Sequence, residues 1–201
     1  KHNVSASTSI KLFGKNLTIN PAYQLSSYWY LDQVNKFWDN LNNEVINDTV
    51  NQFSQLYSQN LSASATTKIY AFYQFAKFLQ GKNQYKIRHT ITPNLNFSYR
   101  PNSNPLPTYQ SDSSGKTLSY SPYSGNIYGA NSSSESGRLG FSLINSMELK
   151  RKNHKDTTDK NPFIKSKILE NFTISSGYDL IKDSFNLDNI QIVARTTLWK
   201  K

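Results

Sequence analysis

The 201-residue sequence has no cysteine, only three histidines and no long apolar run. The absence of cysteine excludes a disulfide framework and any thiolate metal site. The histidines, His2, His89 and His154, stand far apart, so we expect no metal site and no metal catalysis. A transmembrane helix needs about 18 or more consecutive apolar residues. Because no such run occurs, helical membrane spans are excluded as well.

Two further groups of signals are missing. Residues 1–10, KHNVSASTSI, lack the apolar core of a signal peptide, so we expect that a signal was removed or that the chain starts within a longer protein. The sequence also shows no Ser/His/Asp constellation, no phosphate-binding loop and no carboxylate pair with useful spacing. We therefore predict a protein that is not an enzyme and has no cofactor.

What is present is positive charge and many aromatic residues. The net charge is +10 and the pI is about 9.6. Such a balance favours a polyanionic partner such as nucleic acid, anionic lipid headgroups or an acidic saccharide, although it also serves solubility alone. The 13 tyrosines and 11 phenylalanines suit either an aromatic girdle at a membrane interface or a surface on which bases or sugars stack.

One stretch organises the rest of the chain. Along residues 89–100, HTITPNLNFSYR, every second residue is apolar and the residues between are polar. Successive side chains of a strand point to opposite faces, so this pattern predicts a strand with one apolar and one polar face. Twelve residues at about 3.3 Å each, tilted by roughly 40°, rise about 30 Å, which is the thickness of a bilayer core.

The same alternation recurs in six other segments: Val4–Phe13, Leu17–Tyr30, Leu61–Phe75, Arg138–Lys150, Leu169–Leu180 and Ile190–Trp199. The first two are joined by the tight turn Phe13–Asn16 and predict an antiparallel hairpin. Asn145 and Ile144 break the alternation of their strand, which predicts a β-bulge there.

Charge obeys the alternation. The charged residues of the strands fall on the polar parity, as a membrane strand requires, because Lys or Arg at mid-membrane on the lipid face costs about 2–4 kcal/mol. The predicted lumen-lining cations are Lys11, Lys68, Arg100, Arg138, Lys150 and Arg195. The predicted lipid-facing residues are Ile91, Leu95, Phe97, Leu139, Phe141 and Leu143. The predicted aromatic girdle at the strand ends is Tyr28, Trp29, Tyr99 and Trp199.

The connections differ in length. Residues 31–59 space their apolar side chains as a helix does, which favours a helix that binds a partner or a loop that packs on its own sheet. Residues 101–136 are rich in Ser, Asn, Pro and Gly and predict a surface loop with short hairpins around Gly115 and Gly125. Residues 76–88 and 151–167 predict basic or charged links on the other side.

These observations predict an all-β fold. We expect residues 1–201 to form about seven strands of a larger transmembrane, antiparallel, up-and-down β-barrel, with 31–59 and 101–136 as long extracellular loops. The mean hydropathy of −0.64 suits this fold, because half of each spanning strand faces a wet lumen. Seven strands do not close a bacterial barrel, and an open edge in lipid would leave about ten backbone groups unpaired at several kcal/mol each. The segment is therefore expected to be part of a longer barrel.

Three blocks carry a likeness beyond this pattern: IRHTITPNLNFSYRP at 87–101, GNIYGANSSSESGRLGFSLINSMELKRKNHKDTT at 125–158 and ILENFTISSGYDLIKDSFNLDNIQIVARTTLW at 168–199. Together with the hairpin that ends in SYWY at 27–30, they resemble the C-terminal barrel region of the lipopolysaccharide-assembly protein LptD, in the branch found in Bacteroidetes-type bacteria.

The resemblance implies a segment of an outer-membrane translocon that assembles lipopolysaccharide into the outer leaflet. It implies lipopolysaccharide, outer-membrane lipids, a plug lipoprotein of the LptE type and periplasmic bridge proteins as partners, and no nucleic acid. The cysteines that tie the periplasmic jellyroll to the barrel in the best-known branch are missing here, so that linkage is not expected. Two alternatives stay open: a soluble or surface-exposed β-rich module that binds glycans or nucleic acid, and a different outer-membrane barrel such as a porin or transporter.

Overall fold

A computed structural model describes residues 1–74, 85–129, 134–153 and 163–196 of the chain. All regular structure in this described part is β-strand, and the strands pair in antiparallel fashion. None of the described residues forms a helix with the length and apolar character needed to cross a membrane. The predicted all-β, antiparallel fold is confirmed at this level.

The strands range in length from three residues to seventeen. They are β1 (His2–Ser7), β2 (Ile10–Leu12), β3 (Leu17–Tyr30), β4 (Gln33–Asp39), β5 (Glu44–Val50), β6 (Ser54–Thr67), β7 (Ile69–Gln74), β8 (Lys86–Arg100), β9 (Thr108–Gln110), β10 (Thr117–Ser119), β11 (Ser136–Lys152), β12 (Phe163–Asp179) and β13 (Gln191–Arg195).

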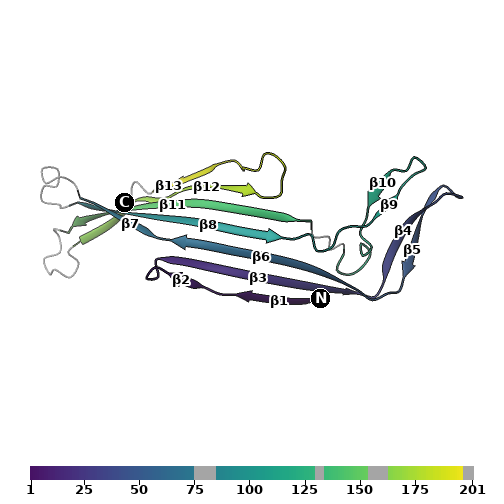
Figure 1. Cartoon of the computed structure of the whole chain (residues 1–201). Coiled ribbons are helices and arrows are strands. Elements are labelled where there is room, and N and C mark those ends of the chain that lie inside the picture. The colour runs from purple at the N-terminus through teal and green to yellow at the C-terminus, as the bar shows by residue number, and fades with distance from the viewer. Residues whose placement is uncertain (75–84, 130–133, 154–162, 197–201) are drawn as a thin grey trace. The chain divides into compact units, whose positions relative to one another are not determined.

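The main sheet has the order β1-β3-β6-β8-β11-β12-β13, with β2 paired to β3 and β7 paired to β8 (Figure 1). Each of the seven predicted alternating segments contributes described residues to this sheet, and Phe75 and residues 197–199 lie outside the described residues. Two of them are interrupted: the first breaks between β1 and β2, and the third breaks at Lys68, between β6 and β7. The bounds of β3 are those predicted from the sequence.

The turn that joins β2 to β3 is as predicted. Phe13, Gly14 and Lys15 all have positive φ, and the Asn16 amide donates to the Phe13 carbonyl oxygen at 3.3 Å. Positive φ is the geometry of tight hairpin turns, and it costs a glycine least.

The chain divides into two compact units. Unit 1 comprises Lys1–Thr8, Pro21–Ser62 and Ser98–Gly137, and unit 2 comprises Ser9–Asn20, Ala63–Phe97 and Arg138–Lys201. Several long strands contribute residues to both units, and the assignment of residues 1–201 to one partial barrel domain stays a prediction.

In unit 1 the helix favoured within residues 31–59 is wrong. Residues 33–50 form the hairpin β4–β5, in which Phe37 pairs with Ile46 and Trp38 pairs with Val45, and residues 54–59 already belong to β6, so this predicted loop ends earlier than expected. The turn explains why: the Asp39 carboxylate accepts hydrogen bonds from the Leu41 amide and the Asn42 side chain, each at 2.8 Å. These bonds lower the pKa of Asp39, the Leu41 amide contributing most. Asp and Asn side chains that bond locally to the backbone favour turns over helices.

The long segment 101–136 contains one of the two predicted hairpins. β9 and β10 pair around Gly115, which has a φ of +83°. No hairpin forms around Gly125; this region consists of turns, with the Asn126 amide bonded to the Tyr123 carbonyl oxygen at 3.1 Å. β11 begins at Ser136, at the end predicted for this loop.

These turns pack on the end of β3. The Tyr123 ring stacks on Tyr30 with centroids 4.3 Å apart, and the Tyr123 hydroxyl lies 3.2 Å from the Gln33 side-chain oxygen. The Val34 amide donates to the Pro122 carbonyl oxygen at 2.9 Å. Tyr30 and Tyr123, 3% and 8% exposed, are the buried large hydrophobic side chains of the described residues.

In unit 2, β11 and β12 form a long ladder. Its register shifts between Asn145 and Glu148, where the pairing Asn145↔Phe172 gives way to Glu148↔Lys167. The ladder is irregular next to Asn145, as predicted, but the extra residues lie on β12, and Ile144 and Asn145 themselves keep the regular register. The connections predicted at 76–88 and 151–167 are shorter than expected, since β8 begins at Lys86, β11 continues to Lys152 and β12 begins at Phe163.

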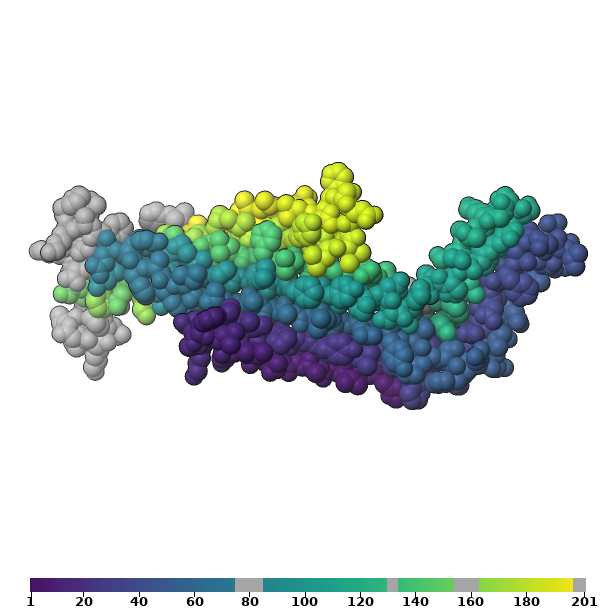
Figure 2. Space-filling model, viewed as in Figure 1, coloured from purple at the N-terminus to yellow at the C-terminus, as the bar shows by residue number. Residues whose placement is uncertain are grey.

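Among the residues that the structure describes, the strands have no covered apolar core. Leu95, Phe141 and Ile192, in the middle of their strands, are 47%, 42% and 63% exposed. In the space-filling view the side chains of β11 to β13 stand at the surface (Figure 2). The apolar rows therefore do not pack on one another as in a β-sandwich, which buries its apolar faces between two sheets.

Packing on Tyr30 should decide how firmly residues 120–128 are held. Tyr123→Ala removes the stacked ring, and we expect the local stability of this segment to fall by about 2 kcal/mol. Hydrogen exchange at the Asn126 and Gly129 amides measures the change. Tyr128→Ala is the control, because Tyr128 is 45% exposed and its loss should have less than half the effect. Equal effects of both variants would contradict the role of the stack.

Candidate functional site: the two faces of the sheet

Cross-strand contacts in unit 2 separate two faces. On what we call the polar face, Lys11 pairs with Thr18, and Asn20 donates to the Ser64 hydroxyl at 3.3 Å. Arg88 and Glu148 form an ion pair of 2.6 Å on this face. Directly paired residues point to the same side of a sheet, so the residues between them form the opposite, apolar face.

All six predicted lipid-facing residues lie on one face of unit 2. Ile91, Leu95 and Phe97 alternate along β8, and Leu139, Phe141 and Leu143 alternate along β11. Leu143 pairs with Ile174, which in turn pairs with Ile192, so an apolar row crosses three strands. Polar side chains also lie on this face: the His89 ring nitrogen and the Asn145 side-chain oxygen are 3.2 Å apart, Ser176 is paired with Phe141, and Arg151 is paired with Ile164.

The six predicted lumen cations do not form one site. Arg138 and Lys150 lie roughly 40 Å apart along β11, at about 3.3 Å per residue. Lys11 is on β2, Arg195 ends β13 opposite Asn171, and Arg100 ends β8 in unit 1. Lys68 stands at the break between β6 and β7, where the ladder does not fix its direction.

The predicted girdle residues differ in placement. In unit 1, Trp29 is 48% exposed and contacts the rings of His2 and Phe53, with centroids 4.3 and 5.9 Å away. Tyr28, the adjacent residue, points to the opposite face and contacts the Tyr128 ring. Tyr99 donates from its hydroxyl to Glu135 at 2.8 Å. Trp199 lies outside the described residues.

Near one end of β11 and β12 the polar face holds a groove of about 450 Å³, with side chains of Asn96, Arg138, Ser142, Ser175 and Gln191 in its lining. Arg138 forms an ion pair with Asp188 across Gly177. A Cβ at Gly177 would lie 2.5 Å from the Arg138 guanidinium and 2.8 Å from the Asp188 carboxylate, so a side chain there would force the two ends of this ion pair to shift. Gly140 is paired directly with Gly177, so two adjacent positions in the lining of this groove have no side chain.

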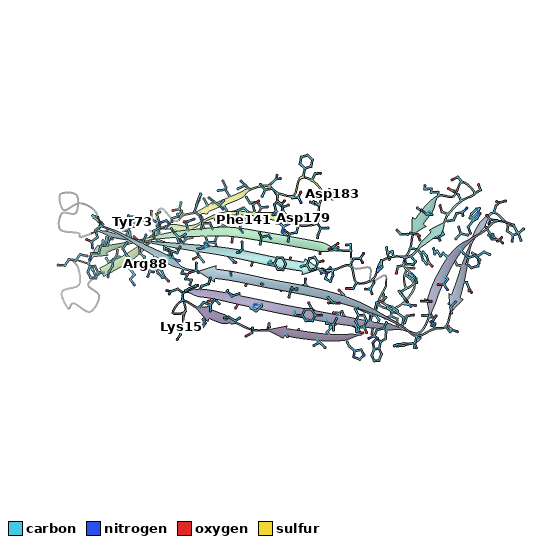
Figure 3. The ribbon with its side chains drawn as sticks, in the orientation of Figure 1. Lys15, Tyr73, Arg88, Phe141, Asp179 and Asp183 are labelled. Carbon is cyan, nitrogen blue, oxygen red and sulfur yellow. The ribbon has the colours of Figure 1, made fainter. Side chains whose placement is uncertain are left out.

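At the other end of the ladders the polar face carries a second groove that sequence reasoning missed. It measures about 280 Å³, and Phe72, Lys86, Arg88, Glu148, Lys150 and Lys165 contribute to its lining. We call it the basic groove; Figure 3 labels Arg88 and Tyr73, on β8 and β7, at this end of the sheet. The signal is the period of two in Lys86/Arg88 and Lys165/Lys167, which falls within the predicted charged links; it continues the strand in which Lys150 is predicted.

Within the described part of the chain, no group of three or more His, Asp or Glu side chains is arranged to hold a metal ion. What the polar face offers chemically is hydroxyls, amides and cations on a hydrogen-bonded scaffold. Such groups bind hydroxylated or anionic ligands and position no nucleophile with a base.

Comparison with known proteins decides the family. A scan against family models matches the model described as LptD protein over residues 1–201. The chain belongs to the LptD family. No curated protein and no solved structure matches it.

LptD family membership has consequences for function. It indicates a role related to lipopolysaccharide transport and assembly, in a family that is not one of enzymes and that resides in the outer membrane. The sequence-based resemblance to LptD is confirmed. The two faces described above are thus the two surfaces of an LptD segment.

The two opposed glycines give a matched test of the Arg138–Asp188 pair. Gly177→Ala should displace the ion pair and loosen the 180–190 segment. This segment is attached to β12 by a hydrogen bond of 2.8 Å from the Asp188 amide to the Gly177 carbonyl oxygen. We expect hydrogen exchange in this segment to become several-fold faster. Gly140→Ala should change nothing, because its Cβ would meet the nearest atom at 3.8 Å. Similar exchange in both variants would show that the pair does not depend on Gly177.

Proposed function

We propose that this chain forms part of the wall of an outer-membrane β-barrel that assembles lipopolysaccharide into the outer leaflet. The apolar face of the sheet contacts hydrocarbon, and the polar face lines a water-filled lumen. The observation that carries the proposal is the uncovered apolar face: Leu95, Phe141 and Leu143 are 47%, 42% and 37% exposed on strands long enough to span a bilayer.

The polar face supports the same arrangement. Exposed charges such as Arg88 and Lys11 lie on it, as parity in a membrane strand demands. Hydroxyl and amide side chains of the larger groove, with Arg138 at its margin, suit contact with a saccharide as it passes. On the other face, Trp29 with His2 and Phe53 has the composition of an interfacial girdle.

The sheet edges indicate that more strands are needed. β1 and β13 end the strand order, so each has an outer edge without a partner among the described strands. Unpaired backbone groups in hydrocarbon cost several kcal/mol each. We infer that further strands of the full protein pair with both edges, and that 31–59 and 101–136 are on the outer side.

The partners follow from this role. They are lipopolysaccharide, outer-membrane lipids, a plug lipoprotein of the LptE type and periplasmic bridge proteins. The role is tested by depleting the parent gene: lipopolysaccharide should accumulate in the periplasm. If the protein were a porin or transporter, its depletion would leave the amount of lipopolysaccharide at the cell surface unchanged. If it were a soluble glycan- or nucleic-acid-binding module, it would purify without detergent.

Two neighbouring aliphatic residues separate lipid contact from simple burial. Leu143 and Ile144 are both 37% exposed, but Leu143 lies on the apolar face and Ile144 on the polar face. In the full-length protein, Leu143→Arg should cost about 2–4 kcal/mol and block assembly into the outer membrane. Ile144→Arg should assemble normally.

The measurement is the amount of heat-modifiable protein in outer-membrane fractions. Equal tolerance of both substitutions would mean that neither face meets lipid. Equal loss would mean that packing, rather than the membrane, restricts both positions.

A further inference from the structure

The basic groove has an arrangement of charge that the wall of a barrel does not need. Its side chains come from neighbouring strands in two rows that cross the sheet. In the first row, Phe72 pairs with Arg88, Arg88 contacts Glu148, and Glu148 pairs with Lys167. Glu148 therefore lies between two cations, and this row is partly neutralised.

The second row has no such carboxylate. Lys150 pairs directly with Lys165 on β11 and β12. On the other side, the Arg88–Glu148 contact and the closeness of Asn96 to Gly140 fix the antiparallel register of β8 and β11, which brings Lys86 beside Lys150. Three lysines thus stand side by side on three strands, spaced by about 4.8 Å.

Like charges in directly opposed positions destabilise a sheet. Within the described residues, none of these three lysines forms an ion pair. Lys150 finds partial compensation in the Phe163 ring, whose centroid is 4.0 Å from the lysine Nζ. A row that repels itself on one surface is explained most directly by a bound anion that supplies the missing negative charge.

The chemistry of the row selects the anion. Three ammonium groups provide nine N–H donors and three charges, which match the oxygens and double charge of a phosphate monoester. Phe72, 73% exposed in the same groove, offers an apolar ring against which the C–H face of a sugar packs. We propose that the basic groove binds the phosphate of a phosphorylated saccharide, with Lys86, Lys150 and Lys165 on the phosphate and Phe72 against the sugar.

This proposal rests on the proposed function, because a water-filled lumen is what leaves the polar face open to a saccharide. It names a point of contact within that lumen. Its test uses purified full-length protein in detergent, so its outcome is independent of whether Leu143→Arg blocks assembly.

The experiment compares three probes by calorimetry at low ionic strength: glucose 1-phosphate, inorganic phosphate and glucose. We expect glucose 1-phosphate to bind, inorganic phosphate to bind several-fold more weakly and glucose not to bind. Lys165→Gln should lower the affinity for glucose 1-phosphate at least tenfold. Lys11→Gln, which removes a lysine from β2 on the same face, should leave its affinity unchanged.

Thermal unfolding provides a second readout. Because the row repels itself, Lys165→Gln should raise the unfolding temperature of the ligand-free protein, and glucose 1-phosphate should raise that of the wild type but not of the variant. A purely structural lysine would give a lower unfolding temperature on substitution.

Three results would overturn the proposal. The first is no binding of either phosphate probe. The second is an equal loss of affinity in Lys11→Gln, which would reduce the effect to overall positive charge. The third is equal affinity for inorganic phosphate and glucose 1-phosphate, which would remove the sugar from the site.

Discussion

Backbone pairing between antiparallel strands is the constraint on which this protein depends. Only Tyr30 and Tyr123 are buried large hydrophobic side chains in the described part of the chain, so the sheet is not assembled around a core. The ladders instead fix where each side chain points, because a residue shares its direction with its cross-strand partners. Apolar rows such as Leu143–Ile174–Ile192 form on one face for this reason, and charge collects on the other.

Alternation is a local property, which is why much of the sheet could be predicted from the sequence. Leu17–Tyr30 is a strand with the bounds predicted, and the ladder is irregular next to Asn145, although its extra residues lie on β12. Prediction failed where another local signal competed. In 31–59 the apolar residues happen to repeat every three or four positions, but the turn-forming chemistry of Asp39 and Asn43, whose φ is +55°, closes a hairpin instead.

Charge misled the prediction at the far ends of the strands. Lys86, Lys150 and Lys165 were assigned to links or strand ends because charged segments usually form loops. They continue the ladders, and here charge is tolerated because it alternates with apolar residues such as Ile87 and Leu149. The period of two was a better guide than composition.

The candidate site shows what a single sequence leaves undetermined. That Arg138 and Lys150 share a face follows from parity alone. That Arg138 meets Asp188 over Gly177, or that Lys150 meets Lys165, depends on the register between strands, which is set by turns and bulges. The sequence alone therefore predicts which face a residue lies on, but not which residues come together in a site.

The bulge in β12 has one more consequence. Between Asn145↔Phe172 and Glu148↔Lys167, β12 uses two residues more than β11. Because the number of extra residues is even, side-chain direction alternates in the same phase beyond the bulge. Lys165 and Lys167 therefore lie on the same face as Thr173 and Ser175. Deleting one residue from this stretch would invert every position beyond it, so that the lysines would lie on the apolar face and the isoleucines on the polar face. The length of this irregularity, more than its composition, is what natural variation in the strand must preserve.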